Sequence, residues 1–353
     1  MSAAASVAAD GSPGEPVTLQ WRPFHFALPA PLRTAAGRLE RRRGWLLRLQ
    51  TARETVGWGE AAPLALGSAP DGALAACALE LEELAGRWSR GDLEERLPGL
   101  PPALAFAVGA ALAEADGLVG AGAGGWRPPP PSAHLLPAGP DALETVQALR
   151  KVWDSARGQG AGLGTNSLPP TVKWKVAVHP ERVEQACYER LIRLLPGGTR
   201  LRLDANGGFD RATAERWVDL LRREERLQWL EQPLAPADQD GLEALALRVP
   251  IALDESLLLR PDLRRNWRGW QVRRPSQEGD PRPLLRELGA GRPRWMVSTS
   301  FETGIGRRWL AHLAALQAEG PTPVAPGLAP GWRAPGDLGA EAPEAVWRAA
   351  LAG

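Results

Sequence analysis

Three acidic residues each follow a short apolar run in the second half of the chain: Asp204 after LRL, Glu231 after LQWL and Asp254 after IAL. They lie 27 and 23 residues apart, about one strand–helix unit each, so we expect all three at the carboxyl ends of neighbouring parallel strands. Three carboxylates brought together repel one another unless a hard divalent cation lies between them, and oxygen-only ligands favour Mg²⁺. Capping of the next helix is the alternative for any single carboxylate, but it explains three matching positions less well.

The run before these acids, TVKWKVAV, carries Lys173 and Lys175 two positions apart. In a strand both lysines point to the same face, whereas Trp174 between them points to the other. Lysines directed into a barrel are costly unless they meet carboxylates or lose their charge, and a lysine of lowered pKa is a usable general base. An edge strand with solvated lysines is the alternative, which the apolar flanks make weaker. The residues therefore predict a metal-assisted proton-abstraction site.

Seven short apolar runs, most of them followed by an amphipathic helix, must position these residues. Strand and helix alternating every 20 to 30 residues or so indicate parallel β/α construction. Because no G-x-G-x-x-G follows the first strand, a closed (β/α)-barrel fits better than an open nucleotide-binding sheet. The expected strands are His134–Pro137, Thr171–Val178, Arg200–Leu203, Leu227–Leu230, Ile251–Leu253, Gly269–Val272 and Trp295–Val297.

The remaining sequence predicts further parts around this barrel. We expect a flexible tail over residues 1–16, an α+β capping domain over 17–125, the barrel over 132–340 and a C-terminal helix over 341–353 that returns to the capping domain. The capping domain should hold a small antiparallel sheet and two or three helices. The breaker-rich run GAGAGGWRPPPP indicates its boundary with the barrel, and an ordinary long surface loop is the alternative.

Composition excludes several classes of function. A formal net charge of +1 gives no basic surface for nucleic acid. No stretch approaches 18 uninterrupted apolar residues and the first residues lack the pattern of a signal peptide, so we expect neither a membrane span nor export. The two cysteines, Cys77 and Cys187, lack metal-type spacing and favour reduced thiols in a cytoplasmic enzyme. The oligomeric state is not readable from the sequence.

The order KxK, D-x-N, E-Q-P and D-E-S resembles the enolase superfamily in its muconate-lactonising-type branch, and more narrowly the o-succinylbenzoate synthase family. The resemblance spans roughly residues 24–338, and its specificity comes from the combination of motifs. They are PLRTAAG at 31–37, GWGEAAPL at 57–64, LLPAG at 135–139, VKWKV at 172–176, RLDANGGF at 202–209, WLEQPL at 229–234, ALDESL at 252–257 and STSFETGIG at 298–306.

The resemblance implies a role for each matching residue. Asp204, Glu231 and Asp254 would bind Mg²⁺, or Mn²⁺ in its place, and the metal would hold a small carboxylate substrate and stabilise its enediolate. Lys175 would be the base and then the acid toward the leaving hydroxide, with Lys173 supporting it. Surrounding roles are implied for Asn206, Glu255 and Arg202, and a substrate contact for Thr34. The hydroxyls and amides of Ser298, Thr299 and Ser300, after the seventh strand, could hold the second carboxylate of a succinyl group, and purely structural turn hydroxyls are the alternative. For Arg202 a structural core ion pair is an equal alternative. The loop Gly57–Glu60 would cap the mouth.

One position departs from the family's pattern. Where the family has another lysine before a proline, this chain has Arg274 before Pro275. Arginine stays protonated and cannot be a base, so proton abstraction is limited to one face of the substrate and Arg274 supplies charge instead. The alternative is a shifted strand with Arg273 inward.

The expected reaction is therefore a syn dehydration of 2-succinyl-6-hydroxy-2,4-cyclohexadiene-1-carboxylate to 2-succinylbenzoate, on the way to menaquinone or phylloquinone. The alternatives are racemisation of N-acylamino acids, epimerisation of dipeptides, and a barrel without catalytic activity.

Overall fold

The computed structural model describes residues 12–34, 37–64, 71–158 and 168–350, and of residues 29–34, 37–38 and 156–158 it describes the backbone alone. An antiparallel sheet and three helices come first along the chain. The strands are β1 (Pro16–Thr34), β2 (Gly37–Thr51), β3 (Val56–Ala61) and β4 (Gly86–Ser89), in the spatial order β3-β2-β1-β4. The helices are α1 (Gly72–Leu84), α2 (Arg90–Arg96) and α3 (Pro102–Ala115).

Both faces of this sheet are covered. Leu47 and Leu49 on β2 belong to a fully buried cluster with α1 and α3, whereas Leu46 points the other way. That second face packs against α12 (Pro343–Ala349), where Val346 and Trp347 are buried. The C-terminal helix thus packs on the sheet that the chain built first.

The glycines of the motif GWGEA allow α3 to lie directly against β3. A Cβ atom at Gly57 would stand 1.8 Å from the carbonyl oxygen of Ala111, and one at Gly59 would stand 2.0 Å from that of Ala107. Only glycine permits such an approach of helix and strand backbones. The prediction that Gly57–Glu60 forms a loop capping the mouth is therefore wrong, because this segment is a buried strand held by packing.

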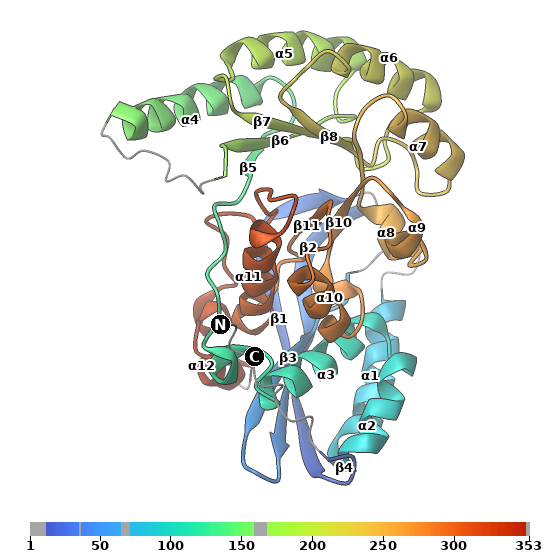
Figure 1. The fold of residues 1–353 in the computed structure, drawn as a ribbon, viewed down its shortest axis with the longest axis vertical. Helices are drawn as coiled ribbons and strands as arrows, with labels where there is room; N and C mark the ends of the chain where they lie inside the picture. Colours follow the sequence, from blue (N-terminus) through green and yellow to red (C-terminus); the bar gives the residue numbers. More distant parts are fainter. Residues whose placement is uncertain (1–11, 35–36, 65–70, 159–167, 351–353) are drawn as a thin grey trace, which may run out of the picture.

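A parallel sheet follows, as the sequence predicts, with strand order β11-β10-β9-β8-β7-β6-β5. Its strands are β5 (His134–Leu136), β6 (Thr171–Lys175), β7 (Arg200–Asp204), β8 (Leu227–Glu231), β9 (Ile251–Leu253), β10 (Trp270–Arg273) and β11 (Trp295–Val297). The helices between and after them are α4 (Asp141–Gly158), α5 (Glu181–Leu194), α6 (Arg211–Leu221), α7 (Gln239–Ala246), α8 (Glu255–Leu259), α9 (Leu263–Asn266), α10 (Pro281–Gly289) and α11 (Gly304–Glu319). Figure 1 shows β6–β8 with α4–α7 at one end of the molecule and the antiparallel sheet at the other.

A short extended segment links the first and last strands of the parallel sheet. Gly327 donates its backbone N–H to Val297 at 2.9 Å and accepts from Thr299 at 3.0 Å, next to the end of β11. Pro326 accepts from the backbone N–H of Ala133, just before β5, at 3.0 Å. The segment therefore takes the eighth position and closes the curled sheet into a barrel of the enolase type, beside its separate capping sheet.

Apolar side chains fill the inside of this barrel on the side of β8–β11. Trp229, Ala252, Val272 and Met296 form one buried cluster, so alternate residues of these strands point inward. Within the described residues no helix is both long and apolar enough to cross a membrane.

Candidate active site

Three buried carboxylates lie at the carboxyl ends of the neighbouring strands β7, β8 and β9. The strand register pairs Asp204 with Glu231 across β7 and β8, and Asp254 directly follows β9. Their exposed fractions are 2%, 0% and 1%, respectively. Lys173 reaches two of them from β6, with its Nζ 2.7 Å from Asp204 Oδ2 and 2.6 Å from Glu231 Oε1. The structure thus brings together the residues that the spacing of the motifs predicts at one rim.

The two lysines of β6 differ in their electrostatics. Burial works against the charge of Lys173, but the attraction of Asp204 and Glu231 outweighs it and raises its pKa, so Lys173 stays charged. Burial lowers the pKa of Lys175, and the charge of Lys173 lowers it further against the opposing effect of Asp204. Lys175 also lines the cavity described below. A lysine that gives up its proton more easily, next to one that keeps it, is the arrangement a general base needs.

Arg274 points into the barrel mouth and holds the third carboxylate. Its Nε lies 2.7 Å from Asp254 Oδ1 and its Nη2 lies 2.6 Å from Oδ2, a bidentate contact. Its Nη1 donates to the carbonyl oxygen of Thr299 at 2.5 Å. Arg273 points to the outer side of β10, where its guanidinium lies over the ring of Trp295. The alternative with Arg273 inward is therefore wrong.

Hydrogen bonds behind the rim fix the carboxylate positions. Asn206 donates from its side chain to Glu255 at 3.0 Å and from its backbone to Asp204 at 3.0 Å. Burial, followed by the charges of Asp254 and Asp204, raises the pKa of Glu255 to about 8. Gln232 accepts at 3.1 Å from the backbone N–H of Asp254, so it sets the direction in which β9 ends.

Arg202 lies one layer deeper on β7 and is fully buried. It donates to Gln228 at 2.7 Å and to the carbonyl oxygen of Ala325 at 2.6 Å, and it stacks over Trp229. Burial lowers its pKa to about 9, against the attraction of Glu231. Among the described residues the hydrogen-bond partners of its guanidinium are neutral, so the interpretation as a core ion pair is wrong. Its charge attracts Glu231 from the layer below.

The hydroxyl residues after β11 are not equivalent. Thr299 donates its hydroxyl to Glu302 at 2.5 Å, and Ser298 donates to the carbonyl oxygen of Gly327 at 3.3 Å. Ser300 bonds Glu302 through its backbone N–H at 2.8 Å, whereas its Oγ is buried without a hydrogen-bond partner among the described residues. Ser300 is therefore the hydroxyl with capacity for a ligand. The side chain of Thr34 lies outside the described residues.

These groups line one cavity of about 170 Å³. Its polar wall includes almost every predicted site residue, while Glu231 lies behind it. Leu39 and Leu64 reach the cavity from the capping domain, and Phe301 from the barrel. The polar lining comprises Lys173, Lys175, Arg202, Asp204, Asn206, Asp254, Glu255, Arg274, Ser298, Thr299 and Ser300.

Glu60 of the capping sheet holds a barrel helix. Its carboxylate accepts from the backbone N–H of Thr303 at 2.9 Å and of Gly306 at 3.0 Å, at the start of α11. Burial, and then repulsion by Glu302, raises the pKa of Glu60 to about 7. Glu60 thus positions the capping domain on the barrel from outside the cavity.

Known proteins with a similar sequence or fold identify the family. Residues 164–269 match the family described as enolase C-terminal domain-like. The o-succinylbenzoate synthase of Thermosynechococcus vestitus is 36% identical over 307 residues, which cover 83% of this chain and 87% of that protein. The chain belongs to the o-succinylbenzoate synthase family. The synthase of Thermobifida fusca is 33% identical, over 48% of this chain and 55% of its own length.

Solved structures agree with this family. The o-succinylbenzoate synthase of Thermosynechococcus elongatus, complexed with Mg in the active site, has a TM-score of 0.73 and 32% identity, with 94% of this chain and 99% of that chain covered. A dipeptide epimerase of Enterococcus faecalis, complexed with Mg and a dipeptide, has a TM-score of 0.64 at 19% identity, covering 90% and 93% of the two chains. At that identity the likeness shows the shared fold alone.

The residues present suit the magnesium that this family implies. The donor set is three carboxylates with oxygen ligands only, and their buried negative charge is balanced by Lys173 and Arg274. Among the described residues no three Asp, Glu, His or Cys side chains surround a common point closely enough to hold a metal. The donor set therefore fits Mg²⁺ by its chemistry but not by its present geometry, in which Lys173 and Arg274 contact the carboxylate oxygens.

Proposed function

We propose that this chain catalyses the syn dehydration of 2-succinyl-6-hydroxy-2,4-cyclohexadiene-1-carboxylate to 2-succinylbenzoate, in the route to menaquinone or phylloquinone. The observation that carries the proposal is the pair of lysines on β6 facing three buried carboxylates, in a chain of the synthase family. The Mg²⁺ complex of the Thermosynechococcus relative supports Asp204, Glu231 and Asp254 as metal ligands here. Mn²⁺ is the expected substitute metal, and the cytoplasm is the expected compartment.

The metal, when bound, neutralises the substrate carboxylate and so makes the proton on the adjacent ring carbon more acidic. Lys175 in its neutral form takes this proton from C1 onto Nζ, and the electron pair of the C–H bond forms the C1–C6 double bond. The C6–O bond breaks, and Lys175 returns the proton to the departing hydroxide, which leaves as water. The ring becomes aromatic, so one base on one face completes the reaction.

Lysine is rare in this chain, and its positions support the assignment of Lys175. The sequence holds three lysines, Lys151, Lys173 and Lys175, whereas the other 39 of its 42 basic residues are arginines. Arginine can supply charge everywhere but cannot release a proton. Two of the three lysines lie on β6, where the reaction requires proton transfer.

Arg274 argues against racemisation and epimerisation. Both reactions need a base on each face of the substrate, and the guanidinium at this position is held by Asp254 and stays protonated. Its charge would lie over the ring of the bound substrate or intermediate and stabilise it through a cation–π contact. We propose Lys173, Lys175 and Arg274 as the catalytic cations.

The other site residues would bind substrate or hold the site in place. Ser300 has an unpartnered hydroxyl among the described residues, so it is the best candidate for the succinyl carboxylate, with Ser298 and Thr299 beside it and Thr34 from the capping domain. Asn206 and Glu255 would orient the metal ligands, and Arg202 would balance charge beneath them.

A direct assay tests this function. Purified protein with Mg²⁺ should bleach the diene absorbance of the substrate, and a chelator should abolish the reaction reversibly. Folded protein that shows no turnover with Mg²⁺ or Mn²⁺ would contradict the proposal. Inversion at the α-carbon of an N-acylamino acid at a comparable rate would favour the racemase alternative instead.

A further inference from the structure

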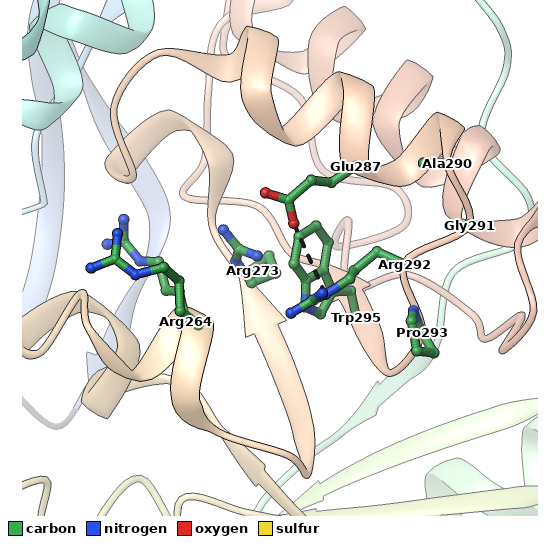
Figure 2. Close-up of a pocket in the computed structure, with 9 residues that line it drawn as sticks. Arg264, Arg273, Glu287, Ala290, Gly291, Arg292, Pro293 and Trp295 are labelled. Atoms are coloured by element: carbon green, nitrogen blue, oxygen red, sulfur yellow. Dashed lines mark ion pairs between the residues drawn. The ribbon is translucent and has the colours of Figure 1, made fainter.

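A second cavity, of about 680 Å³, lies outside the barrel between α9, α10 and the strands β10 and β11. Figure 2 shows the guanidinium of Arg273 at its centre, between Arg264 and the ring of Trp295, with Glu287 and Arg292 on the far side. The cavity is separate from the active site because Arg273 points outward from the strand end at which Arg274 points inward. We call it the arginine pocket.

Positive charge dominates the lining of the arginine pocket. Four arginines and one glutamate line it, and the glutamate is only loosely paired, with 4.0 Å between Glu287 and Arg292. The lining residues with a formal charge are Arg264, Arg265, Arg273, Arg292 and Glu287. Glu278, behind the lining, pairs with Arg273 and lies 3.9 Å from Arg264. The four guanidinium groups thus face only two carboxylates, and the excess positive charge favours a bound anion.

Arg273 is held in place but not satisfied. It is 7% exposed, and its Nε and Nη2 donate to Glu278, the first at 2.8 Å. Its Nη1 is buried and has no hydrogen-bond partner among the described residues. A buried, unpartnered guanidinium nitrogen costs free energy that a bound acceptor would recover.

The neighbouring arginines and the ring of Trp295 also favour an anion in the arginine pocket. Burial lowers the pKa of Arg264, and the charge of Arg273 lowers it further against the attraction of Glu278. Trp295 is covered by guanidinium groups, with Arg273 at 4.1 Å and Arg292 at 5.7 Å from its ring. The stacking keeps these two side chains directed toward the cavity.

We propose that the arginine pocket binds the phosphate group of a small molecule. Guanidinium groups donate in pairs to phosphate oxygens, and a tetrahedral dianion can accept from several arginines at once, which a planar monocarboxylate does less well. The volume exceeds what one phosphate ion needs and lies in the range of small-molecule sites, roughly 300–1,000 Å³. Ala290 and Pro293 give this space an apolar wall.

Isothermal titration of the full-length chain at low salt with EDTA tests the proposal. Inorganic phosphate and AMP are the two probes, and binding at millimolar concentration or tighter is expected for at least one. Tighter binding of AMP would identify a phosphate ester as the ligand, and equal or tighter binding of phosphate would identify the free ion. Either result supports the site.

Surface variants locate the binding without risk to the fold. The double variant Arg265→Gln/Arg292→Gln removes two exposed arginines and should weaken binding at least tenfold. The double variant Arg190→Gln/Arg193→Gln makes the same charge change on exposed positions of α5 and should leave binding unchanged. Glu287→Gln removes the acidic side chain of the lining and should strengthen binding.

The opposite results overturn the proposal. They are no heat of binding with either probe at 5 mM or so, or an equal loss of binding in the two double variants, which would mean that net charge alone attracts the anion.

Discussion

Replacement of Lys173 by methionine should destabilise the metal-free protein strongly. The change keeps most of the side-chain volume but removes the cation that lies 2.7 Å from Asp204 and 2.6 Å from Glu231. At these distances each pair attracts by about 6 kcal/mol with an effective dielectric constant of about 20. Desolvation offsets much of this, so removal of one partner of a buried pair costs roughly 3–5 kcal/mol.

Thermal unfolding in EDTA measures this cost. The unfolding entropy of a chain of 353 residues is about 0.7 kcal/mol per kelvin, so the midpoint should fall by about 4–7 °C. Saturating Mg²⁺ should narrow the gap to the wild type, since the metal takes over the charge that Lys173 supplied. Mg²⁺ at about 100 times the Kd of either protein adds about 2.7 kcal/mol to the stability of that protein. The gap therefore narrows to the extent that the variant binds Mg²⁺ more tightly than the wild type does.

A matched control is Lys151→Met, which removes an exposed lysine on α4 and should leave the midpoint unchanged. If Lys173→Met unfolded within 1 °C or so of the wild type in EDTA, the carboxylates would not need this cation. That result would refute the interpretation of Asp204 and Glu231 as a metal site whose charge is balanced by Lys173.

Three further variants test other parts of the site. Arg274→Gln frees Asp254 from a competing cation, so calorimetry should show at least tenfold tighter Mg²⁺ binding, about 1.4 kcal/mol, and weaker or unchanged binding would contradict this role. Because burial raises the pKa of Glu60 from 4.5 to about 7, the folded state binds its proton more tightly than the unfolded chain does, and stability falls as pH rises through this window. Denaturant unfolding at pH 5 and pH 8 should show that Glu60→Gln removes this loss of stability with rising pH, which is worth up to roughly 3 kcal/mol. The same loss in the wild type and the variant would exclude the effect. Ser300→Ala should raise KM about tenfold with little change in kcat, and an unaltered KM would place the succinyl carboxylate elsewhere.

The barrel was predictable because its periodic signals are local. Each of the seven expected strands overlaps an observed one. Asp204 and Glu231 are the last residues of their strands and Asp254 directly follows β9, at the spacing of one β/α unit. The inward direction of Lys173 follows from strand alternation alone. No comparable local signal exists for partners that meet across the fold.

The misjudged features depend on such long-range contacts. Gly57–Glu60 has the small residues of a loop, yet its glycines serve close packing of β3 against α3. The partners of Arg202 come from β8 and from the segment that closes the barrel, and no sequence pattern indicates them. Gln232, which orients Asp254, was assigned no role from the sequence. Its place beside Glu231 in the motif WLEQPL was the one signal in the sequence for that role.

Turnover by Lys175→Ala tests the central claim most directly. Steady-state dehydration should fall by at least about 10³-fold, because one side chain supplies both the base and the acid. Calorimetry on the same preparation should show Mg²⁺ binding that is as tight as in the wild type or tighter, and Lys151→Ala should retain full activity. Turnover within tenfold of the wild type, with the metal bound, would contradict the assignment of Lys175 as the base.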